Sequence, residues 1–92
     1  MRTQLNEALK SAMRGRDACG VSTLRLILAA IKDRDIAARG TGRSEGLTED
    51  EILDLLQKMI RQRQESIALY EQGGRLDLVE REAREIEVIR EC

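Results

Sequence analysis

Few residues in this chain have the types and spacing that catalysis requires. There is no histidine to act as a base, and the carboxylates are spaced like pairs on helix surfaces rather than like a general acid and base. Tyr70 is the single tyrosine, and its simpler interpretation is a core residue with a bonded hydroxyl. The sequence therefore predicts no active site and no cofactor.

The two cysteines, Cys19 and Cys92, form neither a metal-ligand cluster nor a disulfide framework. Without histidine the common zinc ligand sets are also out of reach. We expect no metal site and two free thiols.

Three basic residues could instead bind an anion. Arg25, Lys32 and Arg39 are seven residues apart, so on a helix they lie along one edge at intervals of about 10.5 Å. Such a ridge can contact phosphates without aromatic residues, whereas one tyrosine cannot provide a platform for stacking bases. Other basic residues could extend the ridge: Arg14, Arg16 and Arg43. The alternative, favoured by a sequence pI of about 5.5, is a solvated edge balanced by carboxylates.

The charge is also divided unevenly along the chain. Residues 1–43 hold nine basic and four acidic side chains, a balance of +5, and residues 44–92 hold seven and thirteen, a balance of −6. One interpretation of this imbalance is that the basic half of the chain provides a face that binds an anion. The other is that oppositely charged helices of one bundle lie together.

The elements that would position these residues are helices. The chain has 92 residues, no proline, one aromatic residue, 41% apolar and 36% charged residues, which is typical of a small all-α domain. Apolar residues recur every three or four positions in four segments, so we expect a single four-helix bundle over residues 1–92, built from antiparallel helical hairpins. The expected helices are about 2–14, 18–39, 48–72 and 76–91.

Helix ends are marked by capping residues. Asp17 is the expected cap of the second helix, and Thr48 with Glu51 has the spacing of a capping box for the third. Gly73-Gly74 should end the third helix and reverse the chain. Residues 40–46, with three glycines, are expected to form a mobile tip and lack the lysine and preceding strand of a phosphate-binding loop.

Two polar residues fall within the apolar arc of the third helix. Arg63 and Ser66 lie there, and Glu82 lies in the matching arc of the fourth helix. If the two helices fold back at Gly73-Gly74, Arg63 and Glu82 differ by roughly 3 Å along the axis, so the sequence predicts that they pair. The alternative is that Arg63 and Ser66 line a groove for a phosphate.

No apolar run approaches the roughly 18 residues of a membrane span, and no signal-peptide pattern opens the chain. We therefore expect a cytoplasmic protein without a membrane partner.

Four runs of the sequence resemble the YqeY (GatB/YqeY) family. They are L-R-L-I-L-A-A-I-K at 24–32, L-T-E-D-E-I at 47–52, R-Q-R-Q-E-S-I-A-L-Y-E-Q-G-G-R-L-D-L-V at 61–79 and E-R-E-A-R-E-I at 80–86. Their order and spacing fit the family over nearly the whole chain. The family pattern falls on seven residues: Arg25, Arg63, Ser66, Tyr70, Arg75, Glu82 and Glu85. Six of these, all but Arg25, are expected to form a buried polar motif.

The resemblance implies a helical domain similar to the tail of the B subunit of the tRNA-dependent amidotransferase. Family members are customarily described as amidotransferase-like, carbon–nitrogen ligases with glutamine as amide donor. Because this chain has none of the amidotransferase catalytic motifs, the resemblance implies a tRNA-associated accessory domain rather than an enzyme. Its implied partners are tRNA and the amidotransferase or aminoacyl-tRNA machinery.

Family members usually continue into a second, smaller helical bundle, which is expected to be absent here because the sequence stops at Cys92. A surface left by that missing bundle could drive self-association. The alternative function is a helical protein–protein interaction module that binds no nucleic acid.

Overall fold

The computed structural model describes residues 1–43 and 45–91, and these residues form four α-helices. They are α1 (Arg2–Arg14), α2 (Ala18–Gly40), α3 (Glu49–Gln72) and α4 (Leu76–Arg90). Each bound lies within one residue of the expected one, and the all-α, four-helix fold is confirmed. None of the helices in this described part of the chain is long and apolar enough to cross a membrane.

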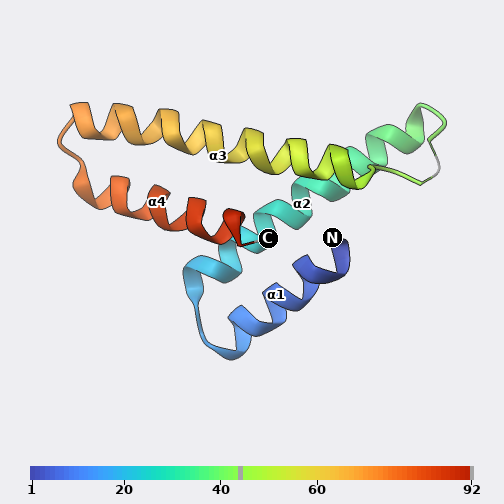
Figure 1. Ribbon diagram of the computed structural model, residues 1–92, viewed down its shortest axis with the longest axis horizontal. Coiled ribbons are helices and arrows are strands. Elements are labelled where there is room, and N and C mark those ends of the chain that lie inside the picture. The colour runs from blue at the N-terminus through green and yellow to red at the C-terminus, as the bar shows by residue number, and fades with distance from the viewer. Residues whose placement is uncertain (44, 92) are drawn as a thin grey trace.

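The helices are arranged as two antiparallel hairpins, α1–α2 and α3–α4, with α2 lying between α1 and the second hairpin (Figure 1). The molecule is flat, with extents of 47 × 30 × 17 Å. The outer half of the α3–α4 hairpin projects beyond α1 and α2, and we call this part, residues 60–85, the arm.

The core lies where the two hairpins meet. All four helices contribute a fully buried side chain, with Leu5, Ile27, Ile52 and Ile89 each at most 2% exposed. The fully buried residues of α3 are confined to its first half. In the second half of α3 no residue is fully buried.

The predicted caps are present. The Asp17 side chain accepts a hydrogen bond from the Gly20 amide (3.1 Å) and begins α2. The Thr48 hydroxyl accepts from the Glu51 amide (3.2 Å) while Glu51 accepts from the Thr48 amide (3.1 Å), which completes the capping box of α3. In the α3–α4 turn, Gly74 takes the left-handed conformation (φ +69°) that closes a helix end.

The segment between α2 and α3 is anchored at Leu47, directly after the expected mobile tip of residues 40–46; Ser44 lies outside the described residues. Asp35 of α2 accepts bonds from both Arg2 terminal nitrogens (2.7 and 2.8 Å) and from the Leu47 amide (2.8 Å). Arg2 also donates to the Leu47 carbonyl (3.0 Å). This three-way contact, which we call the Asp35 anchor, ties α1, α2 and the loop together.

Candidate nucleic-acid interface

The predicted basic ridge lies on the outward side of α2. Arg25, Lys32 and Arg39 are all exposed, and none forms an ion pair with any residue in 1–43 or 45–91. Ala29 and Ile36 lie between them on the same edge, and the Ile36 side chain is 57% exposed. The edge therefore presents three cations that form no ion pair, separated by small or apolar side chains. Of these, the Arg39 charge also contributes weakly to lowering the pKa of Asp35.

The residues that could extend this ridge differ in availability. Arg14 and Arg16 are exposed at the α1–α2 turn, close to the first turn of α2. Arg43 is not free: its guanidinium binds both carboxylate oxygens of Glu51 and donates to the Gly46 carbonyl (3.1 Å). Because Glu51 stabilises its charged form, the pKa of Arg43 is raised, and Arg43 supports the loop rather than the ridge.

Arg63 pairs with Glu85 and not with the predicted Glu82. Its Nε donates to Glu85 Oε2 (3.2 Å), and its Nη1 donates to the Met59 carbonyl (3.2 Å). Helical side chains point toward the amino end of their helix, so the Arg63 guanidinium is displaced away from the hairpin turn. In the antiparallel α4, residues farther from that turn have higher numbers, so this displacement favours Glu85 over Glu82. The prediction compared Cα positions only and was wrong by one turn.

Glu82 lies beside the Arg63–Glu85 pair but does not form an ion pair with Arg63. Its side chain is 12% exposed and approaches only Arg81 within ion-pair distance, at 3.8 Å. Burial and the neighbouring Glu85 carboxylate raise the pKa of Glu82, with Arg63 acting weakly in the opposite direction. The arm therefore holds two carboxylates beside one guanidinium, of which Glu85 is the paired one.

The remaining motif residues do not form a ligand groove. The Ser66 hydroxyl donates to the Gln62 carbonyl of its own helix (3.1 Å), and Tyr70 is half-buried. Arg75 contradicts the prediction of a buried residue: its side chain is 60% exposed and pairs with Asp77 (3.4 Å) at the turn. Since Glu85 compensates the charge of Arg63 and the Gln62 carbonyl engages the Ser66 hydroxyl, these contacts do not favour the phosphate groove suggested for Arg63 and Ser66.

Within residues 1–43 and 45–91, no cluster of acidic, histidine or cysteine side chains has the arrangement of a metal site. Cys19 is a half-buried free thiol, and Cys92 lies outside the described residues.

A family model described as Yqey-like protein matches residues 2–92. The chain belongs to the YqeY family. Similar proteins include three from yeasts, each called altered inheritance of mitochondria protein 41, mitochondrial. The one from Lachancea thermotolerans is 41% identical over 86 residues, which cover 94% of this chain and 44% of that protein. Those from Kluyveromyces lactis and Saccharomyces cerevisiae (strain YJM789) are 36% and 34% identical, over 92% and 89% of this chain and 44% and 42% of those proteins.

This YqeY chain thus spans less than half the length of the curated relatives that it matches. The comparisons also overturn one prediction from the sequence. These relatives are named as mitochondrial proteins, which contradicts the cytoplasmic location expected from the lack of a signal peptide. The absence of a signal-peptide pattern was too weak a basis for that expectation, because segments that target proteins to mitochondria have a different composition.

Sequence reasoning missed the Asp35 anchor of this YqeY chain. Asp35 is buried, and hydrogen bonds from Arg2 and Leu47 lower the pKa of its carboxyl to about 2. A signal was present, because Asp35 continues the buried stripe of α2 four residues after Ile31. A charge on a buried stripe requires a partner, and that requirement was applied to Arg63 but not to Asp35.

Proposed function

We propose that this chain is a non-catalytic, tRNA-associated accessory domain that contacts RNA phosphates along the outward edge of α2. The observation that carries the proposal is the ridge itself: Arg25, Lys32 and Arg39 are exposed, evenly spaced and unpaired among the described residues. Phosphate contacts of this kind position a nucleic acid without reading its sequence.

Family membership supports tRNA as the nucleic acid. The YqeY family resembles the tail domain of the tRNA-dependent amidotransferase B subunit, and the chain matches the family model over residues 2–92. The same resemblance suggests the amidotransferase or aminoacyl-tRNA machinery as partners. An accessory role fits a chain without histidine, in which the half-buried Arg63 is engaged by Glu85.

The test is tRNA binding at 50 and 200 mM salt, measured by fluorescence anisotropy. If three phosphates are neutralised, the affinity should fall about 20- to 40-fold over this fourfold change in salt. Reversing the charge of the ridge in the triple variant Arg25→Glu, Lys32→Glu, Arg39→Glu should abolish binding.

The matched control reverses three exposed charges on other helices: Lys10→Glu, Arg61→Glu and Arg90→Glu. Both triple variants change the net charge by the same amount. A larger loss of tRNA binding in the ridge variant would therefore show that the position of the charges matters. Equal loss of binding in the two variants, or tRNA binding insensitive to salt, would refute the proposed interface.

A protein–protein interaction module is the second candidate, and exposed leucines on the arm favour it. Leu69 and Leu76 lie on either side of the α3–α4 turn, and each is 67% exposed. The affinity of a partner that binds through apolar contacts changes little with salt concentration, because salt screens interactions between charges. A partner bound equally well at 50 and 200 mM salt, and lost in Leu69→Ser, would support this function instead.

A further inference from the structure

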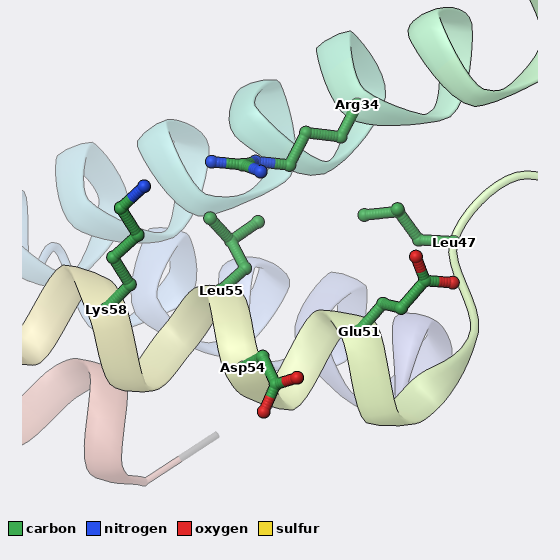
Figure 2. Close-up of a pocket in the computed structure, with 6 residues that line it drawn as sticks. All are labelled: Arg34, Leu47, Glu51, Asp54, Leu55 and Lys58. Carbon is green, nitrogen blue, oxygen red and sulfur yellow. The ribbon is translucent and has the colours of Figure 1, made fainter.

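A shallow groove between α2 and α3 brings two cations together on a face distinct from the ridge. It is lined by residues from α2, the loop and α3: Arg34, Leu47, Glu51, Asp54, Leu55 and Lys58. Figure 2 shows Arg34 and Lys58 extending from opposite walls over Leu55. Arg34 lies about 180° around α2 from Arg25, so this site does not depend on the proposed RNA interface.

Neither cation is neutralised within the groove. In the part of the chain that the structure describes, neither Arg34 nor Lys58 forms an ion pair. Asp54 is four residues before Lys58, the spacing at which a helical ion pair is expected. In Figure 2 the Lys58 ammonium is instead directed toward α2, while the carboxylate of Asp54, which also lines the groove, points away from that ammonium.

The second acidic residue of the groove is already occupied. Glu51 accepts bonds from the Arg43 guanidinium and from the Thr48 amide. These contacts lower the pKa of Glu51 to about 2, because they stabilise the carboxylate. Its negative charge is therefore compensated locally, and the end of the groove near Arg34 and Lys58 stays positive.

We propose that Arg34 and Lys58 bind one phosphate group in this groove, above Leu55. The planar fork of an arginine and the mobile ammonium of a lysine are the two side chains that most often hold phosphate oxygens. A groove of about 240 Å³ that is open to solvent has room for one phosphate group with some of its water, but not for an enclosed ligand. The phosphate can belong to a small molecule or to an RNA backbone.

The test follows backbone amide signals of Leu47, Glu51 and Lys58 by ¹⁵N NMR. One arm titrates inorganic phosphate, a second titrates a short single-stranded RNA, and chloride at equal ionic strength is the reference. We expect saturable shifts at these amides. Shifts with both titrants mean that a free phosphate is sufficient, and shifts with RNA alone mean that the backbone supplies the phosphate.

Two variants and a matched control test the assignment to these side chains. Arg34→Gln and Lys58→Gln should each weaken binding by about two- to fivefold, the range typical of one exposed charge pair, and the double variant should remove the saturable shifts. Lys10→Gln, an exposed lysine on α1, should leave them unchanged. Asp54→Asn should strengthen binding about twofold, because it removes the one uncompensated negative charge lining the groove.

The proposal is overturned if neither phosphate nor RNA gives saturable amide shifts, or if the Arg34→Gln, Lys58→Gln double variant retains them. Failure here is separable from failure of the proposed tRNA interface. The triple ridge variant of α2 should still bind inorganic phosphate in the groove, whatever happens to its binding of tRNA.

Discussion

Replacing Arg63 with alanine should destabilise the arm strongly. The side chains of Arg63 and Glu85 are only 11% and 21% exposed, so the substitution leaves a largely desolvated carboxylate without its cation. Breaking a buried pair costs about 3 to 5 kcal/mol, and the residual exposure of Glu85 reduces this to about 2 to 3 kcal/mol. For a chain of 92 residues this corresponds to a fall in Tm of about 10 to 20 °C.

The assay is urea unfolding followed by circular dichroism, supplemented by a double-mutant cycle. Arg61→Ala is the control, because Arg61 lies on the same helix but is exposed and forms no ion pair within the described residues. It should change the free energy of unfolding by less than about 0.5 kcal/mol. The cycle should give a larger coupling energy for Arg63 with Glu85 than for Arg63 with Glu82.

The two glutamates give a sharper test, because the structure assigns them opposite effects. Glu85→Gln removes the paired charge and should lower the free energy of unfolding by about 2 kcal/mol. Glu82→Gln should leave it unchanged or raise it, because burial and Glu85 disfavour the ionised form of Glu82. Destabilisation by Glu82→Gln alone, or a negligible coupling between Arg63 and Glu85, would refute this account of the arm.

Two further predictions concern the Asp35 anchor. Gly46→Ala should cost about 2 kcal/mol or more in urea unfolding, because a Cβ at Gly46 (φ +75°) would lie 2.5 Å from Asp35 Oδ1. Gly42→Ala shares the positive φ (+95°) but meets no atom within 4 Å, so a loss as large as that of Gly46→Ala would contradict the role of the close contact. The free energy of unfolding should also depend on pH. The pKa values of Asp35 and Glu51 are lowered to about 2, below their values in the unfolded chain. The stabilisation from these two carboxylates is therefore complete above about pH 4.5 and is lost as the pH falls toward 2. Thermal unfolding between pH 5 and pH 2 should show this fall, and a curve for Asp35→Asn as steep as that of the unmodified chain would argue against the anchor.

Local signals in the sequence were sufficient for the helices and their ends. The apolar periodicity, Asp17, the Thr48–Glu51 box and Gly74 each act within a few residues, and all appear in the structure. The reversal at Gly73-Gly74 also followed from the sequence, as did the presence of an acidic partner for Arg63 on α4.

Long-range register could not be obtained in the same way. Choosing Glu85 over Glu82 required the direction of the Arg63 side chain as well as its position along the helix. The Asp35 anchor joins residues that are 33 and 12 positions apart in the sequence, and nothing local specifies how α1 lies against α2. The groove between α2 and α3 depends on the same tertiary arrangement, so Arg34 and Lys58 did not stand out among the other cations.

The uneven burial along α3 has a consequence for its dynamics. Its fully buried residues are Ile52, Leu55, Leu56 and Met59, whereas no residue from Ile60 to Gln72 is fully buried. One continuous helix should therefore exchange its amide hydrogens with deuterated water at two rates, slowly beside the core and faster toward Gln72. A partner that bound only the outer turns of α3 would contact the part of the helix that opens most easily. The cost of keeping those turns helical would then offset part of the binding free energy.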